Sequence, residues 1–311
     1  MIRRPPFWAL CAALAALASS CGGSTTALNS SQLIAFSSDR ALPPQSEADD
    51  FDTRRLDLYV MNTDGSHVER LTRNSLTDVF PAVSRDGRQI AFTRDIHGYA
   101  QVFVIDLRDR NVRMLTHSHA NSGLPAWSPD GRLIAFATDR HAPGGDVIYV
   151  MNADGSDQHP VTHNLPNVND AWPGWAPDGK HLVFARETGA GSAIYTVDLE
   201  GHSLKRLTRD EHSLDTQPAW SPDGNEIAFE SDLFMLPGQI FTMRADGTMR
   251  RQLTDPGVGA SSRPSWSSDG KLIVFMASRD HHTDVWVMNA DGSHQVQLTR
   301  NHGFAGFPGA G

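Results

Sequence analysis

The chain has 311 residues, of which 39% are hydrophobic and 20% are charged. This composition is ordinary for a folded globular protein and excludes general disorder. The formal net charge is -9, and the basic residues never gather in long runs. A nucleic-acid-binding protein is therefore excluded, because such proteins need a basic stripe or patch.

The first residues are typical of an export signal. A short basic segment, 1–4, precedes an apolar run from Phe7 to Ala18. That run has the length of a signal-peptide core and is too short to span a bilayer comfortably. We therefore expect residues 1–20 to be removed when the protein is exported.

The segment "ASSC", 18–21, resembles a bacterial lipobox, in which the cysteine is acylated. The only other cysteine, Cys11, lies inside the apolar run, so the exported part has no disulfide framework. We expect lipidation of Cys21, followed by a flexible tether at 21–30 that is rich in Gly, Ser and Thr. Gly22 is not the aspartate associated with inner-membrane retention, so we expect the periplasmic side of the outer membrane.

One phrase recurs along the rest of the chain. It reads "WSPDGRLIAF" at Trp127, and variants of it begin at Val83, Trp175, Trp220 and Trp266. A proline stands two residues before each copy, and a further proline follows at the same spacing, with steps of 44, 48, 45, 46 and 44 residues: Pro81, Pro125, Pro173, Pro218, Pro264 and Pro308. Such a period predicts a repeat architecture.

Each repeat carries signals for four short strands. The first ends at the tryptophan, and a turn such as "SPDG" follows, whose glycine accepts a positive φ. The second strand ends in phenylalanine with Ile or Leu two residues earlier, so both side chains point into one core. A third strand such as 146–152 leads through an Asp-Gly hairpin to a fourth strand that ends in Leu-Thr or Val-Thr. Four antiparallel strands in about 45 residues are typical of a propeller blade.

We therefore predict an all-β fold, a six-bladed β-propeller of four-stranded antiparallel blades, over residues 31–311. The first repeat begins directly at its second strand, and 304–310 lies at the right period to supply the missing one. Pairing of this C-terminal strand with the N-terminal blade would close the ring and remove an exposed edge. A β-sandwich of short strands is the alternative, although a sandwich does not require a constant period.

The phrases "PAWSPDG…IAF", "IYVMNADG" and "RLT" resemble the TolB-like β-propeller repeat of bacterial envelope proteins, and the resemblance covers 31–311. It implies a propeller that acts through protein contacts at the cell envelope. TolB proteins also carry an α/β N-terminal domain. The short segment between Cys21 and the first repeat predicts that this chain lacks that domain.

Common catalytic motifs do not occur in the sequence. It has no Gly-x-Ser-x-Gly elbow, no His-Glu-x-x-His, no phosphate loop and no Cys/His ligand array. We therefore expect no enzymatic activity and no cofactor. The leading hypothesis is a monomeric binding module that contacts an envelope protein or peptide through one propeller face. It would touch the membrane only through its lipid anchor and would bind no nucleic acid.

The 14 histidines leave an alternative open. Several follow the fourth strands, and acidic residues stand three positions before three of the prolines. In a propeller these connections run towards the central channel, so we take the following as a candidate ligand or metal site at the channel mouth: Asp78, His117, His119, His163, Asp170, His212, Asp215 and His302. Such a group could hold a divalent metal. The other interpretation is that these are solvated loop residues whose carboxylates cap backbone.

Similar repeats occur in an oligogalacturonate lyase, where a metal at the propeller face helps to remove a proton beside a sugar carboxylate. That resemblance implies, as the alternative function, a metal-dependent carbohydrate-active enzyme that uses the channel mouth.

Two further features are candidate contact surfaces. Trp172 and Trp286 fall outside the register of the repeated tryptophans, which we expect to pack inside and between blades. The segment 37–55 is a long, charged and proline-bearing insertion in the first blade. Long loops on a rigid scaffold often carry recognition, and a solvated excursion is the equal alternative.

Overall fold

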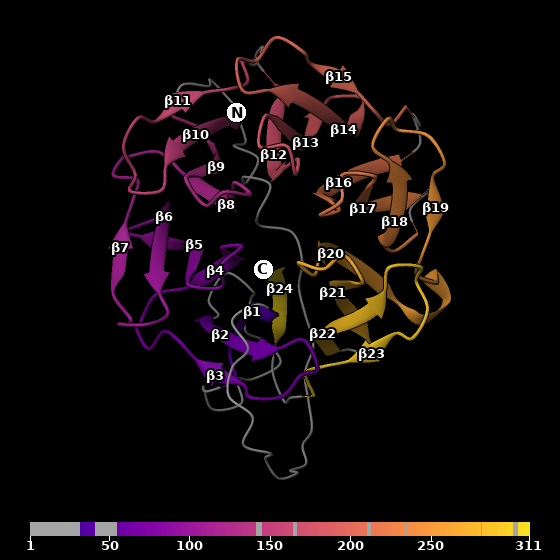
Figure 1. The fold of residues 1–311 in the computed structure, drawn as a ribbon, viewed down its shortest axis with the longest axis horizontal. Coiled ribbons are helices and arrows are strands. Elements are labelled where there is room, and N and C mark those ends of the chain that lie inside the picture. The colour runs from indigo at the N-terminus through magenta and orange to yellow at the C-terminus, as the bar shows by residue number, and fades with distance from the viewer. Residues whose placement is uncertain are drawn as a thin grey trace.

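The computed structural model describes residues 32–40, 55–140, 145–163, 167–209, 213–233, 236–280, 282–300 and 304–311. The predicted signal peptide, Cys21, the tether, most of the loop 37–55, His212 and His302 lie outside the described residues. Those described form β-sheets arranged around a central axis, with the C-terminus at the centre beside the last strand (Figure 1). No helix in this part of the chain is long and apolar enough to cross a bilayer.

Four of the sheets have four strands each, which follow one another from the axis outwards (Figure 1). One contains β24 (Ala305–Ala310), β1 (Leu33–Ser38), β2 (Asp57–Asn62) and β3 (Glu69–Arg70). The next contains β4 (Asp78–Val83), β5 (Gln89–Ile96), β6 (Tyr99–Asp106) and β7 (Val112–Met114). The third contains β8 (Ser122–Trp127), β9 (Leu133–Thr138), β10 (Val147–Asn152) and β11 (His159–Pro160). The fourth contains β20 (Ala260–Trp266), β21 (Leu272–Arg279), β22 (His282–Asn289) and β23 (Val296–Gln297).

The fifth sheet has eight strands. They are β12 (Asn169–Trp175), β13 (His181–Thr188), β14 (Gly191–Asp198), β15 (Lys205–Arg206), β16 (Ser213–Trp220), β17 (Glu226–Leu233), β18 (Gln239–Arg244) and β19 (Arg251–Gln252). One parallel pair, Ser192 with Leu214, joins β14 to β16. The 3-10 turn η3 (Pro256–Val258) is the one helical element among the described residues.

The predicted count of six separate blades is wrong. The structure has four separate four-stranded blades, and the other two sequence repeats share the eight-stranded sheet. The physical reason is that β16 starts early enough for Leu214 to pair with Ser192. The Ser192 hydroxyl strengthens this junction by donating a hydrogen bond to the carbonyl oxygen of Asp215 at 2.9 Å.

The all-β class is confirmed, and so is closure of the ring by the two ends of the chain. β24 pairs antiparallel with β1, with Ala310 opposite Ile34 and Ala305 opposite Ser38. The Ser38 hydroxyl also donates to the carbonyl oxygen of Phe304 at 2.6 Å. The strand edge that the first repeat would otherwise expose is therefore covered.

The core lies within the sheets and between neighbouring ones. The repeated phenylalanine in each second strand is completely buried: Phe36, Phe92, Phe136, Phe184, Phe229 and Phe275. Clusters of apolar side chains combine residues from adjacent sheets, as where Ala91 of β5 and Phe136 of β9 share one cluster. This face-to-face packing fixes the inner strands around the axis and so positions the site described below.

The threonine that ends each repeat has a structural role. Its hydroxyl oxygen accepts a hydrogen bond from a backbone N–H of the third strand, six times around the ring, at 2.9–3.0 Å: Thr72, Thr116, Thr162, Thr208, Thr254 and Thr299. A buried backbone N–H needs an acceptor. The side chain supplies it where the short fourth strand ends.

Candidate binding funnel at the ring axis

Each inner strand is interrupted at the same place. The pairing register shifts across a two-residue segment that ends in the repeated proline, as between Val79 and Ala82 in β4. Proline has no N–H to donate, so it cannot take part in the ladder. The residue before each proline has a φ between 52° and 58°; we call these the bulge residues: Phe80, Leu124, Trp172, Gln217, Arg263 and Phe307.

A positive φ is strained for these residues, because none of them is glycine. A left-handed conformation disfavours an L-residue by about 1–2 kcal/mol. Six such residues stand at equivalent places on the innermost strands. Strain of this kind persists only where the surrounding structure enforces it, and it clusters at functional sites. The six strained residues therefore indicate a candidate functional site at the ring axis.

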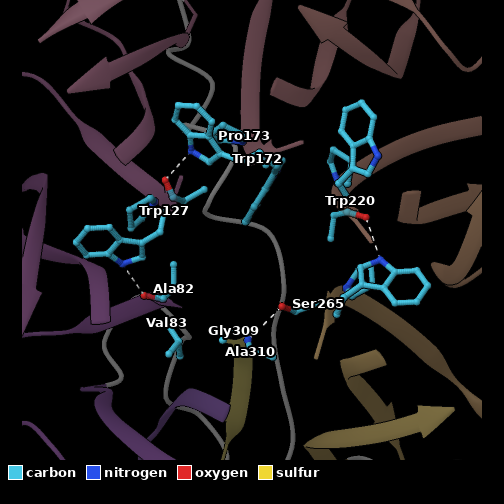
Figure 2. Close-up of a pocket in the computed structure, with 18 of the residues that line it drawn as sticks. Ala82, Val83, Trp127, Trp172, Pro173, Trp220, Ser265, Gly309 and Ala310 are labelled. Atoms are coloured by element: carbon cyan, nitrogen blue, oxygen red, sulfur yellow. Dashed lines mark hydrogen bonds between the residues drawn. The ribbon is translucent and has the colours of Figure 1, made fainter. Parts of the chain in front are cut away.

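A cavity of about 310 Å³ opens there, which we call the axial funnel (Figure 2). Its lining contains all six bulge residues and the prolines that follow them. Towards the turns after the inner strands it is lined by four tryptophans: Trp127, Trp175, Trp220 and Trp266. Pro129, Pro177 and Pro222 of those turns also line it, so the funnel faces that side of the ring.

Side chains from opposite sides of the ring meet on the axis. Phe80 and Trp172 make an edge-to-face contact with ring centroids 5.5 Å apart, and Phe80 lies 4.8 Å from Phe307. The guanidinium carbon of Arg263 lies 4.3 Å from the rings of Trp172 and Phe307 and 4.6 Å from Phe80. Because β8 stands between β4 and β12 around the ring, these contacts span the axis. All four side chains line the funnel.

A carboxylate lies close behind this cluster. Burial raises the pKa of Glu230 to about 7, the positive charge of Arg263 opposes the rise, and Asp232 adds to it. The Oε2 atom of Glu230 is buried and has no hydrogen-bond partner among the described residues. The protonation of Glu230 therefore depends on the nearby positive charge of Arg263.

The acidic residues predicted at the channel mouth lie inside the sheets instead. Asp78 is fully buried and accepts two hydrogen bonds from Arg94, at 2.6 and 2.8 Å. Asp170 accepts two from Arg186, at 2.6 and 2.7 Å. Asp215 accepts one from the Ser231 hydroxyl at 2.6 Å, with Arg250 at 3.3 Å. Each of these three carboxylates pairs with an arginine and neutralises its positive charge.

Those arginines lie over the aromatic side chains of the same sheets. The guanidinium carbon of Arg94 is 5.1 Å from the Phe92 ring and 4.9 Å from the Phe103 ring, and Arg186 covers Phe184 and Tyr195 in the same way. A planar guanidinium can stack on rings while its edge binds a carboxylate. The observed geometry thus gives Asp78 and Asp170 a packing role.

The predicted histidines do not join them. His117, His119 and His163 are exposed, and they precede the inner strands, at the opposite end from the funnel. The described residues contain no group of three His, Cys, Asp or Glu side chains that could hold a metal. The ligand role of the predicted set stays a prediction, since His212 and His302 lie outside the described part.

The two unusual tryptophans have different places. Trp172 is a bulge residue, and its indole extends into the centre of the ring (Figure 2). Trp286 pairs with Phe275 in its sheet, and the guanidinium carbon of Arg279 lies 4.2 Å from its ring. Trp286 therefore occupies the aromatic position of a third strand, while Trp172 lines the axial funnel.

Sequence reasoning used the prolines as markers of the period and overlooked the residue before each one. That position varies among Phe, Leu, Trp, Gln and Arg, while the proline that follows it repeats. The repeated proline keeps the bulge, and a varied position on the inner strands is free to define a binding surface. This contrast is the signal that could have located the funnel.

Comparison with known proteins agrees with this fold. Residues 163–306 match the profile of the TolB beta propeller domain family. No curated protein sequence matches the chain.

Solved structures give a wider match. TolB from Acinetobacter baumannii is similar with a TM-score of 0.75 and 22% identity, over 89% of this chain and 66% of that one. A putative TolB from Agrobacterium tumefaciens has a TM-score of 0.67 and 22% identity, over 88% and 96%. An oligogalacturonate lyase from Vibrio parahaemolyticus has a TM-score of 0.54 and 11% identity, over 75% and 72%. At these identities the likeness is one of fold.

Proposed function

Because residues 163–306 match the TolB beta propeller domain family and the fold resembles that of TolB, we propose that the chain is a non-enzymatic binding module that holds a segment of another protein in the axial funnel. The observation that carries the proposal is the ring of strained bulge residues, which converge on one cavity. Strained residues of this kind cluster at functional sites.

The character of the funnel supports a binding role. Its wall is rich in proline and tryptophan, and aromatic side chains supply large contact areas at low entropic cost. Its volume of about 310 Å³ lies at the lower end of ligand cavities, which span about 300–1,000 Å³. A short segment of chain is therefore the natural occupant.

The first residues of the sequence support a place of action in the cell envelope. The apolar run at 7–18 and the lipobox-like segment at 18–21 support export, with lipid attachment at Cys21 on the periplasmic side of the outer membrane. An envelope protein or peptide is thus the partner that we propose. The metal-dependent lyase alternative lacks a supporting observation, because Asp78 and Asp170 are held by arginines inside the sheets.

Site-specific photo-crosslinking in living cells tests the proposal. A photoreactive residue would replace Arg85 or Pro129, which line the funnel at its rim, and, as the control, Asp154 on an outer hairpin. We expect defined crosslinks to one partner from the two rim positions and none from the control. Equal crosslinking from all three positions, or crosslinking from Asp154 alone, would contradict a funnel that binds.

A further inference from the structure

We propose that the chain's own N-terminal segment, residues 22–31, is the resident occupant of the axial funnel, and that a partner must displace it in order to bind. This inference rests on the proposed function, because it states what controls access to the same cavity. It follows from the place where the first strand begins, from the length and composition of the segment before that strand, and from one buried donor in the funnel.

The first strand begins at the rim of the funnel. β1 starts at Leu33, whose carbonyl oxygen accepts a hydrogen bond from the Gly311 N–H at 3.2 Å. The next residue, Ile34, pairs with Ala310. Gly311 and Ala310 both line the funnel, at the end of the innermost strand that faces its opening. The chain therefore enters the ring beside the opening, and the N-terminal segment is attached there.

The segment is long enough to reach the centre of the ring. Leu28 stands five positions before Leu33, so an extended chain places it up to about 17 Å away. Phe307, one of the bulge residues, stands four positions before Gly311, which is a depth of about 13 Å at the rise of a strand. Residues 22–28 can therefore reach the aromatic side chains on the axis without any change in β1.

The composition of the segment fits the wall of the funnel. The segment reads "GGSTTALNSS" and contains no charged side chain, in a chain of which 20% is charged. Burial of a charge against proline and tryptophan is unfavourable, and small neutral side chains avoid that cost. Small residues also suit a cavity of about 310 Å³. Ala27 and Leu28 are the apolar part of the segment, and we assign them to the deepest position.

One donor in the funnel lacks an acceptor that the segment can supply. The Nε1 atom of Trp172 is buried and has no hydrogen-bond partner among the described residues. A buried N–H without an acceptor is unfavourable, and native structures seldom leave one. The indoles of the four repeated tryptophans, in contrast, all donate to backbone carbonyl oxygens: Trp127, Trp175, Trp220 and Trp266. A backbone carbonyl of the segment would give Trp172 the same kind of partner.

Attachment at the rim favours occupation of the funnel. A segment joined to its site by a few residues has an effective concentration on the order of millimolar, so a weak contact is enough to keep it bound. A free partner competes with it, and the apparent affinity for the partner falls with the fraction of open funnels. The segment thus sets a threshold that a ligand must exceed.

The experiment measures binding of a labelled copy of the segment. A peptide of residues 22–31 with an N-terminal fluorophore is titrated with the purified chain and with the variant A27D/L28D, and fluorescence anisotropy reports the complex. The two carboxylates should drive the variant's own segment out of the apolar wall, so that its funnel is open. We expect A27D/L28D to bind the peptide at least ten times more tightly than the unchanged chain.

Two further variants locate the binding. The control V68D/V296D adds two carboxylates at exposed side chains outside the funnel lining, and it should bind the peptide as weakly as the unchanged chain. W172F, made together with A27D/L28D, keeps a ring and removes the indole N–H, so it should weaken peptide binding several-fold. Melting curves show that each variant is folded.

A crosslink tests whether the occupant comes from the same molecule. A photoreactive residue would replace Asn29 in the full chain, and mass spectrometry would identify the residues that it reaches. We expect crosslinks within one molecule to residues that line the funnel, such as Pro129. Crosslinked dimers would make a second copy the occupant and would overturn the inference.

Three other results would overturn it as well: equal peptide binding by the unchanged chain and a folded A27D/L28D, unchanged peptide binding by a folded W172F, or crosslinks from position 29 only to residues outside the funnel. If W172F does not fold, the contrast between the unchanged chain and A27D/L28D still decides. The proposed function fails separately, through the absence of partner crosslinks from the rim. Partner crosslinks of equal yield in the unchanged chain and in A27D/L28D would keep the binding module and reject the segment as its competitor.

Discussion

Ala310, in the last strand, pairs with Ile34, in the first, so the two ends of the chain lie in one sheet. Gly309 pairs with Ala35 beside them, and the backbone N–H of Ala310 donates to the Ser265 hydroxyl of the neighbouring sheet at 3.1 Å (Figure 2). The C-terminal strand thus connects two sheets as well as closing one.

Deletion of 305–311 should therefore destabilise the whole ring. It removes β24, leaves the edge of β1 without a partner and uncovers apolar residues such as Phe36. We expect a melting temperature lower by several degrees and aggregation in size-exclusion chromatography. A synthetic peptide of residues 304–311 should restore part of the stability. Unchanged melting and solubility would mean that this strand does not close the ring.

The buried Asp78–Arg94 pair should contribute far more to stability than an exposed one. D78N leaves the guanidinium of Arg94, whose side chain is 12% exposed, without its counter-charge. We expect a loss of about 3–5 kcal/mol in the free energy of unfolding. The control E69Q breaks the exposed pair with Arg110 and should lose less than about 1 kcal/mol. Urea unfolding measures both, and equal losses would contradict the packing role of Asp78.

Glu230 should make the protein less stable as the pH rises. Burial raises its pKa to about 7 in the folded protein, so between its ordinary value and pH 7 the folded state holds a proton that the unfolded state has lost. Stability from this group is present at low pH and is lost through that window. E230Q removes this titratable group. We expect the free energy of unfolding of E230Q minus that of the unchanged protein to be more positive at pH 8 than at pH 5. Urea unfolding at both pH values measures the difference, and parallel pH profiles would refute it.

Two glycines with positive φ should respond differently to alanine. At Gly247, with φ 93°, a Cβ would lie 2.7 Å from the carbonyl oxygen of Leu207 in the preceding repeat. At Gly131, with φ 70°, a Cβ would meet nothing within 4 Å. G131A should lose only the conformational term of about 1–2 kcal/mol. G247A should lose more in thermal unfolding, because the backbone must move, and equal effects would show that the hairpin does not pack closely.

Much of the fold could be predicted because its signals are local. The turn at Ser128 shows why: its hydroxyl donates to Asp130 at 2.7 Å and accepts the N–H of Leu133 at 2.9 Å, while Gly131 has a positive φ. Each of these residues lies within one short phrase. Repetition of such phrases set the period, the strand order and the closure by 304–310.

The number of separate sheets could not be predicted, because it depends on one contact between repeats. A single pair, Ser192 with Leu214, merges two of them. Serine and leucine both occur in strands at the edge of a sheet, so these residue types do not indicate that the two repeats pair. The start of β16 at Ser213 decides the contact.

The candidate site was only partly predictable for a similar reason. Asp78 appeared in the sequence as a polar residue before a proline, and its partner Arg94 lies across a hairpin on β5. Trp172 was identified by its unusual register, whereas Arg263 and Phe307 carried no signal until their shared φ was seen. Side chains that meet on the axis come from distant repeats, so pattern alone does not bring them together.

The tryptophan hydrogen bonds have a consequence for unfolding. Trp127, Trp175 and Trp266 each tie one repeat to the inner strand of the repeat before it, and pairing of β24 with β1 leaves no repeat at a free end. In an open repeat array, terminal units fray first. In this ring every unit has neighbours on both sides, so we expect melting to be cooperative, with the circle lost in one all-or-none step.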